Sequence, residues 1–358
     1  MRRLFISNSN QPHGLRAVIV TLLALVLVIV VVDRAVGVIV PRIAMEPPFI
    51  LRQQNVPGVE RLWAFEDAGV APVVFTGSSQ GHMAFSPHVF NDRVAALTGH
   101  AIQSVNVSVW GSVTTIQRDL IRNLLLPTHP KIILYAIEMR AALPAAQHGL
   151  AVDDFRNKPL GYALTVSSPI ERNVLLWLLR HSNLVSYRDN LRDWLTGTRA
   201  IDDVGYSMSV VDDLGYFRDP TIYNRDPTVI QTQFVPFTMD DATRQLFVDI
   251  KTSCDQASVP CILLNLPLHE QSYQYISAGD EAVYQATLHG SGLAIWDFNT
   301  KECRAALGDA SFFNLNHLNA SGAEKLSAWV ADVYIHRQMG QPAVGDPSCA
   351  QFSDPPTE

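Results

Sequence analysis

The amino-acid sequence predicts an α/β protein: a three-layer αβα sandwich with a parallel five-stranded sheet, preceded by one transmembrane helix. Two observations predict this class. A long apolar run begins at residue 17, and farther along the chain short apolar runs of strand length alternate with amphipathic segments of helix length. A third observation, the loss of that alternation over residues 140–238, indicates an insertion in the sheet domain rather than a second domain.

The apolar run near the N-terminus predicts a signal anchor. Residues 17–32 contain one polar residue, Thr21, and residues 35–40 are apolar again after Asp33 and Arg34. At about 1.5 Å per residue, residues 17–32 alone fall short of a hydrocarbon core of about 30 Å, so we expect the helix to continue through 40. A cleaved signal peptide is the alternative, but no A-x-A site follows the run. Asp33 and Arg34 either contact a partner helix or extend to the membrane interface.

Arginine placement gives a slight bias in orientation. Three arginines precede the apolar run and two follow it within ten residues, which favours a cytoplasmic N-terminus and an extracytoplasmic domain, periplasmic or extracellular. The expected segments are a cytoplasmic N-terminus at 1–16, the anchor at 17–40, a juxtamembrane linker at 41–71, the domain at 72–338 with its insertion at about 140–238, and a disordered tail at 339–358.

Strand and helix patterns alternate through the domain. Five buried strands are expected at 72–76, 102–109, 131–137, 261–266 and 293–298, with helices at about 86–98, 113–124, 169–195, 240–257, 281–289 and 323–337. Ser86 and Pro87 are typical of a helix start, as cap and first helical residue. Short links between strands and helices predict a parallel sheet with right-handed crossovers, whose ligands bind at the carboxyl ends of the strands.

Composition narrows the function classes. A net charge of −7 without a long Lys/Arg run argues against nucleic acid as a partner. The four cysteines (Cys254, Cys261, Cys303 and Cys349) form no CxxC and no zinc-type cluster, so no metal and no cofactor is expected. On an oxidising side of the membrane they permit two disulfides, with three pairings open and free buried thiols as the alternative.

Two sequence motifs place candidate catalytic side chains at the carboxyl edge of the predicted sheet. Ser79 lies in the turn Gly77-Ser78-Ser79 directly after the first strand, a position that exposes a hydroxyl at the carboxyl ends of the strands. His317 lies in the loop before the last helix and therefore faces the same edge. A histidine within reach of a serine hydroxyl is the arrangement of a general base and a nucleophile. Each motif alone is more often structural than catalytic.

Together these motifs resemble the first and last blocks of SGNH hydrolases. The closest likeness is the membrane-anchored branch, whose members carry a GSS nucleophile turn and a D-x-x-H-L-N-x-x-G-A end block and serve cell-surface acylation. Here the end block is N-x-x-H-L-N-x-x-G-A over residues 314–323. The resemblance covers roughly residues 72–337, is weakest over 140–238, and implies an SGNH or flavodoxin-like sandwich that needs no cofactor.

By this resemblance Ser79 matches the nucleophile and His317 the base. The backbone N–H groups of Ser79 and Gly111 match the oxyanion hole, although a glycine before a helix is also ordinary turn chemistry. Asn314 stands where the family has an aspartate. An amide can orient an imidazole but gives an imidazolium no charged partner, and in a serine protease the same exchange lowers the rate by about 10⁴.

Other side chains are weaker candidates. Asp297 and Asp309 are near enough in sequence to supply the missing carboxylate. Arg140, in the place after the third strand where many family members have an asparagine motif, is a candidate to bind an anionic or carbonyl group or to pair with Glu138. His269 follows the fourth strand and is a second weak substrate-binding candidate, and His82 lies three residues beyond Ser79.

Two classes of function follow. The first is an acyltransferase or esterase that acts on a cell-envelope glycan or polymer through a Ser79 acyl intermediate. The resemblance implies, beside the lipid bilayer, an integral membrane partner, commonly a membrane-bound O-acyltransferase. The second is an inactive SGNH-like domain that serves as a scaffold or subunit of a membrane complex, which Asn314 favours. Retention of Ser79 and His317 favours the enzyme.

Overall fold

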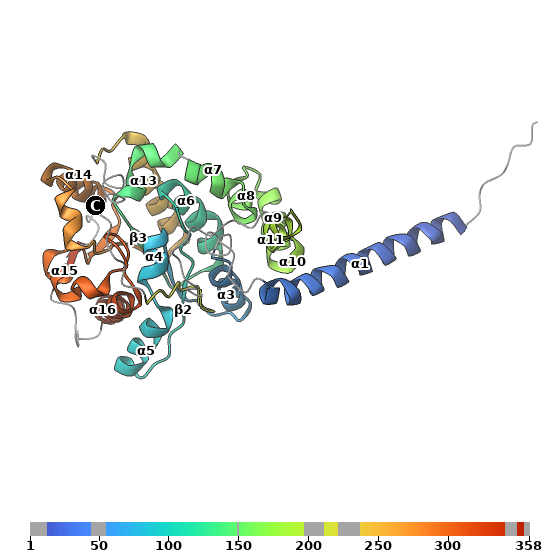
Figure 1. Ribbon diagram of the computed structural model, residues 1–358, viewed down its shortest axis with the longest axis horizontal. Helices are drawn as coiled ribbons and strands as arrows, with labels where there is room; N and C mark the ends of the chain where they lie inside the picture. The colour runs from blue at the N-terminus through green and yellow to red at the C-terminus, as the bar shows by residue number, and fades with distance from the viewer. Residues whose placement is uncertain are drawn as a thin grey trace, which may run out of the picture.

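A computed structural model describes residues 13–43, 55–148, 150–196, 211–220, 237–340 and 349–353. The parts of the expected cytoplasmic segment, linker, insertion and tail that fall between these ranges lie outside the described residues. The domain is a three-layer αβα sandwich, and one long helix projects from its side (Figure 1). The predicted fold class is therefore confirmed.

The sheet has five parallel strands in the order β2-β1-β3-β4-β5 and a sixth, antiparallel strand at its edge. The strands are β1 (Val73–Gly77), β2 (Ser104–Asn106), β3 (Ile132–Ile137), β4 (Cys261–Asn265), β5 (Ala294–Asp297) and β6 (Gln351–Ser353). Strand order reverses between β1 and β3, the point at which sheets of this type bind ligands. The expectation of a disordered tail is wrong for β6, because its backbone pairs with β5.

Alternating strand residues pack on the two faces of the sheet. Val74, Ile133 and Leu263 belong to one core, which is covered by α3, α6, α13 and α14. Phe75 and Leu134 belong to the other, which is covered by α4, α5, α15 and α16. The helices on the first face are α3 (Val56–Asp67), α6 (Thr114–Leu120) with the turns η1 (Ile121–Leu125) and η2 (Leu126–Thr128), α13 (Asp241–Ala257) and α14 (Ala278–Gly290). On the second face lie α4 (Ser79–Ala84), α5 (Pro87–Thr98), α15 (Lys301–Leu307) and α16 (Ala320–Gln338).

Helix α3 falls within the stretch expected to be a linker without regular structure. Its residues Val59 and Leu62 are buried in the first core. Asn55 caps the helix and is itself fully buried, and its side-chain nitrogen donates to the carbonyls of Asn106, Ser108 and Gly215. A buried amide needs hydrogen-bond partners, and these three carbonyls lie in the domain. The segment that carries Asn55 and α3 is therefore part of the domain.

The insertion forms a chain of short helices along one side of the molecule (Figure 1). These are η3 (Arg140–Ala142), η4 (Pro144–His148), α7 (Leu150–Arg156), α8 (Pro159–Thr165), α9 (Pro169–His181), α10 (Asn183–Ser186) and α11 (Arg188–Thr196). One continuous helix over 169–195 was expected, and this is wrong. Ser182 takes an extended conformation, and its side chain accepts a hydrogen bond from the N–H of Val185, which starts a new helix.

Helix α1 (His13–Ile43) is the one described helix that is long and apolar enough to cross a membrane, over Arg16–Ile39. Its side chains over residues 16–32 are exposed, and its C-terminal part lies beside α10 (Figure 1). Asp33 is buried and accepts hydrogen bonds from the hydroxyl of Ser182 and from the N–H of Leu184. Of the two alternatives for Asp33, the structure shows a helix contact, and the partner lies within the chain.

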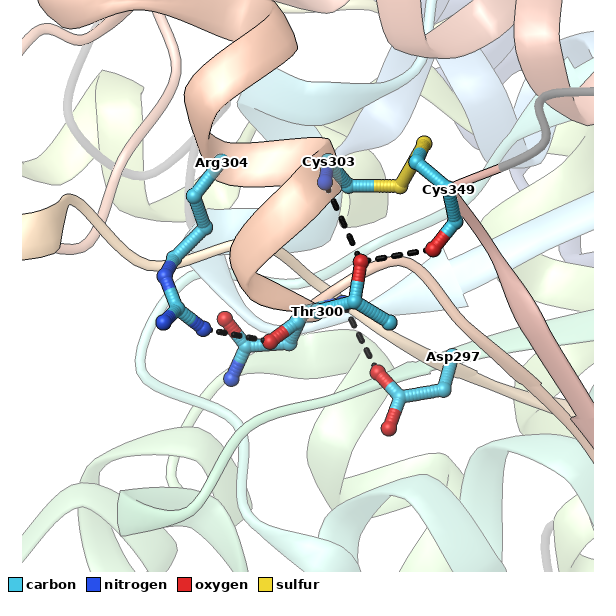
Figure 2. The surroundings of a disulfide bond; sticks show 6 residues. Asp297, Thr300, Cys303, Arg304 and Cys349 are labelled. Carbon is cyan, nitrogen blue, oxygen red and sulfur yellow. Dashed lines mark hydrogen bonds between the residues drawn. A yellow bond between two sulfur atoms is a disulfide. The ribbon is translucent and has the colours of Figure 1, made fainter.

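The cysteines form two disulfides, Cys254–Cys261 and Cys303–Cys349. The first joins the end of α13 to the start of β4. The second joins α15 to the chain just before β6 and is reinforced by Thr300, whose hydroxyl donates to the carbonyl of Cys349 and accepts the N–H of Cys303 (Figure 2). This connection holds the C-terminal strand against the sheet.

Candidate functional site

Ser79 is the first residue of α4, two residues beyond the end of β1 and at the edge where strand order reverses. Ser78 caps this helix, and its hydroxyl accepts the N–H of Gln80. The turn fits closely against β3, because a Cβ at Gly77 would lie 2.8 Å from Ala136. Ser79 itself is half-buried. The turn therefore presents the Ser79 hydroxyl at the carboxyl edge of the sheet.

His317 comes from the loop between η7 (Asp309–Ser311) and α16. A short antiparallel bridge pairs Phe312 with Leu318, and the N–H of Phe313 donates to the carbonyl of His317 at 2.8 Å. Its ring nitrogen Nε2 lies 2.8 Å from Ser79 Oγ. The structure thus brings together two residues that are 238 positions apart in sequence, at hydrogen-bonding distance.

Asn314 occupies the far side of the His317 ring. Its Oδ1 lies 3.0 Å from His317 Nδ1 and also accepts the backbone N–H groups of Asn316 and His317. Because both backbone partners are donors, the atom facing His317 is the amide oxygen. An oxygen there requires that Nδ1 carry the proton, so Nε2 is free to accept the hydroxyl hydrogen of Ser79.

Burial governs the ionisation of His317. Desolvation first, and the positive charge of Arg140 second, together lower the pKa of the imidazole to about 4. Among the described residues, the group at Nδ1 is the uncharged amide oxygen of Asn314, which does not oppose these effects. His317 is therefore neutral above about pH 5, the form that acts as a base.

A polar network fixes the loop that carries Gly111 relative to Ser79. The carbonyl of Gly77 accepts the N–H of Val109, the hydroxyl of Ser112 and the amide of Gln117. Gly111 lies in the turn between Val109 and Ser112 with φ +69°, is exposed, and has open space where a Cβ would lie. A left-handed conformation of this kind favours glycine.

Glu138 lies one residue beyond the end of β3. Its carboxyl group accepts hydrogen bonds from Ser78 and Gln80, the two neighbours of Ser79. Burial raises the pKa of Glu138, against the opposing effects of these hydrogen bonds and of Arg140. Arg140 is exposed and close enough to act electrostatically on both Glu138 and His317.

Sequence reasoning missed two aromatic residues at the site. The Trp110 ring lies nearly parallel to that of His317, with centroids 6.4 Å apart. Phe217, from the insertion, contacts Trp110 edge-on and packs on Met83 of α4. The position of Trp110 next to Gly111 was an available signal, whereas the aperiodic sequence around Phe217 gave none.

Four weaker candidates are not brought to Ser79. His269 is buried, its Nε2 lies 2.9 Å from Asp309 and its Nδ1 accepts the N–H of Gln271. Both ring nitrogens of His269 are therefore engaged in contacts between and within loops. The expectation that His269 binds substrate is not supported. Asp309 is hydrogen-bonded to His269, and Asp297 accepts hydrogen bonds from Asn265, Gln285 and Asn299, so neither lies at His317 Nδ1. His82 is fully buried against Phe217.

Other features lie apart from Ser79. Cavities of about 520 Å³ and 420 Å³ are lined by residues that include neither Ser79 nor His317. Among the described residues, potential metal-ligand atoms gather within 4.8 Å at His88, Asp212 and Asp213, where α5 meets the insertion. Nothing in this group touches Ser79 or His317.

The candidate site is thus a Ser-His-Asn constellation at the reversal point of an α/β sheet, with a tautomer fixed by Asn314. Comparison of the chain with models of known protein families gives no match, and comparison with curated proteins gives no significant match either.

Proposed function

We propose that this chain is a membrane-anchored, extracytoplasmic acyltransferase or esterase of SGNH type, with Ser79 as nucleophile. The observation that carries the proposal is the continuous hydrogen-bonded series from Ser79 Oγ to His317 Nε2 at 2.8 Å, and from His317 Nδ1 to Asn314 Oδ1 at 3.0 Å. A hydroxyl is a poor nucleophile without such a base.

In the first half-reaction, Ser79 Oγ attacks the carbonyl carbon of an ester, and its proton passes to His317 Nε2. The negative charge that develops on the carbonyl oxygen is stabilised by the backbone N–H groups of Ser79 and Gly111. The tetrahedral intermediate then breaks its bond to the leaving alcohol, which takes the proton from Nε2. An acyl-Ser79 ester and a free alcohol result.

In the second half-reaction, a hydroxyl of an acceptor, or water, attacks the acyl-Ser79 carbonyl while His317 takes its proton. Collapse of this intermediate returns the proton to Ser79 Oγ. Transfer to an acceptor hydroxyl gives a new ester, and transfer to water gives an acid. A half-buried serine outside the two cavities described suits a surface-accessible polymer such as a cell-envelope glycan.

Three further observations support the setting. The GSS turn and the N-x-x-H-L-N-x-x-G-A block resemble the membrane-anchored SGNH branch. The apolar helix α1 is long enough to span a bilayer, and two disulfides suit an oxidising compartment. By the same resemblance, the acyl group is supplied by an integral membrane partner, a membrane-bound O-acyltransferase.

One observation favours the alternative, an inactive scaffold. The imidazolium that must form in each half-reaction gains no carboxylate, and burial already disfavours it. The two functions differ in whether Ser79 reacts with electrophiles.

A fluorophosphonate probe distinguishes them. The purified full-length chain in detergent should become labelled at Ser79, Ser79→Ala should abolish labelling, and His317→Ala should reduce it strongly. Ser167→Ala, at an exposed serine in the insertion, is the matched control and should label normally. A folded wild-type chain that remains unlabelled would support the scaffold.

A further inference from the structure

The contact between α1 and the insertion fixes where α9 and α10 lie along the anchor. Three groups of the turn before and within α10 donate to the Asp33 carboxylate: the hydroxyl of Ser182, the side-chain amide of Asn183 and the N–H of Leu184. A carboxylate on an otherwise apolar helix is tolerated because these donors replace water. This contact fixes the position of the insertion along the axis of α1.

A second residue of the same helix face confirms the close approach. A Cβ at Gly37 would lie 2.6 Å from the side chain of Asn183. Asp33, Val36 and Gly37 are spaced at i, i+3 and i+4, and Asp33 and Val36 are the buried residues of this part of α1. The helix α10 therefore packs directly on α1.

This contact lies inside the apolar span. The span runs over Arg16–Ile39, and Asp33 lies about 26 Å along the axis from Arg16 at about 1.5 Å per residue. A hydrocarbon core is about 30 Å thick. With Arg16 at one boundary of the hydrocarbon core, α10 lies at the opposite boundary rather than far outside the bilayer.

Helix α9, which leads into α10, exposes large apolar side chains in addition to those that pack on the core. Ile170, Val174 and Trp177 form one stripe at i, i+4 and i+7, and they are 78%, 53% and 58% exposed. Leu176 and Leu179 pack against the core on the other side. A contiguous exposed apolar stripe marks an interaction surface.

The two arginines of α9 are held against the chain itself. Arg180 forms ion pairs with Glu66 at 2.7 Å and with Asp67 of α3. Arg172 donates to the carbonyl of Val166 at 2.9 Å. Both arginines are thus bound to the domain, while the apolar stripe is exposed together with Glu171, Asn173 and His181.

We infer that α9 lies in the interfacial region of the bilayer leaflet next to the domain, with Ile170, Val174 and Trp177 in contact with lipid. The contacts of Asp33 and Gly37 place α10 at the membrane boundary, and a tryptophan in an apolar stripe is typical of that depth. The inference rests on the proposed membrane anchoring by α1. It does not depend on the chemistry of Ser79.

Lipid-specific quenching of tryptophan fluorescence tests this. The full-length chain is reconstituted into phosphatidylcholine vesicles with or without lipid brominated on its acyl chains. Residues 13–43 contain no tryptophan, so any quenching reports on the domain. We expect bromolipid to quench the wild-type chain, Trp177→Phe to lose at least half of that quenching, and Trp329→Phe, on α16, to retain it.

A second pair of variants tests the contact with α1. Gly37→Leu, which collides with Asn183, should reduce Trp177 quenching, whereas Val26→Leu, on the exposed part of α1, should leave it unchanged. Equal quenching in the wild type and in Trp177→Phe would overturn the inference, as would a Trp177 that is shielded from lipid by another copy or another protein. Failure of the wild type to reconstitute would instead contradict membrane anchoring, and fluorophosphonate labelling of Ser79 reports separately on the enzyme.

Discussion

Asn314 presents its amide oxygen to His317 because three donors converge on that atom. Two of them are backbone N–H groups, at 2.8 Å from His317 and 3.0 Å from Asn316. In the serine-protease case, replacing the aspartate by asparagine costs about 10⁴ in rate because the histidine takes the wrong tautomer. Here the amide cannot turn its nitrogen toward the ring without losing both backbone bonds. The cost of the amide is therefore limited to the missing negative charge.

The first prediction concerns that charge. Asn314→Asp keeps all three accepted hydrogen bonds and adds a charged partner for the imidazolium. Hydrogen bonds to charged groups are worth about 1–2 kcal/mol more than neutral ones, which corresponds to a gain of roughly five- to thirtyfold in kcat/KM for an activated ester. Steady-state kinetics measure it. A loss of activity in the folded variant would show that the neutral amide is required.

The second prediction concerns Arg140 and pH. Burial first, and Arg140 second, hold the pKa of His317 at about 4. Since the neutral ring is the base, kcat/KM should rise with pH through that value. Arg140→Gln removes a positive charge and should move this rise to higher pH, whereas Arg140→Lys should leave it in place. A pH–rate profile that is identical in wild type and Arg140→Gln would contradict this electrostatic role.

The sequence could predict those site residues that adjoin a periodic strand or helix, but not those whose position depends on distant parts of the chain. Ser79 and His317 were predictable because each directly adjoins a strand or a helix whose period is readable. Whether Asn314, Asp297 or Asp309 faces His317 was not predictable, because all three lie in loops and only the fold sets their distances. Phe217 reaches the site through the Asn55 and Gly215 contacts, which have no sequence periodicity.

At the scale of elements, buried apolar runs predicted all five parallel strands. Elements that depend on a side-chain hydrogen bond or on a disulfide were not predicted. Helix α3 depends on the Asn55 cap, and α10 on the Ser182 cap. Strand β6 depends on the disulfide beside it (Figure 2). Caps and pairings of this kind are decided by partners far away in sequence.

The third prediction compares the two disulfides. Cys303–Cys349 closes a separation of 46 residues and Cys254–Cys261 one of 7. Loop-closure entropy in the unfolded chain then makes the first worth about 4 kcal/mol and the second about 2 kcal/mol. Chemical denaturation of the paired Cys→Ser variants measures the difference. An equal or larger loss for the 254–261 pair would contradict the assignment of the C-terminal strand to the folded domain.

At the scale of the whole molecule, the anchor and the domain act as one unit. Helix α1 contacts the insertion through Asp33, and a loop of the insertion contacts the site through Phe217. Under the proposed anchoring by α1, these contacts hold the site close to the membrane surface rather than on a free tether. Such an arrangement suits the proposed acyl transfer between a membrane partner and an envelope polymer.

The fourth prediction concerns orientation. With the N-terminus in the cytoplasm, protease added to intact spheroplasts should digest the chain beyond residue 45. A cytoplasmic marker protein should survive the same treatment, which controls for lysis. Protection of the whole domain until the membrane is opened would reverse the orientation.

The central claim is that Ser79 forms an acyl intermediate with His317 as its base. Brief incubation of the purified full-length chain with an activated acetyl ester, followed by acid quench and mass spectrometry, tests it most directly. The account predicts one added acetyl group on the peptide that contains Ser79, present in wild type and Asn314→Asp and absent in Ser79→Ala. A folded chain that turns over the ester without acetylating Ser79, or that neither reacts nor turns over in either form, would contradict it.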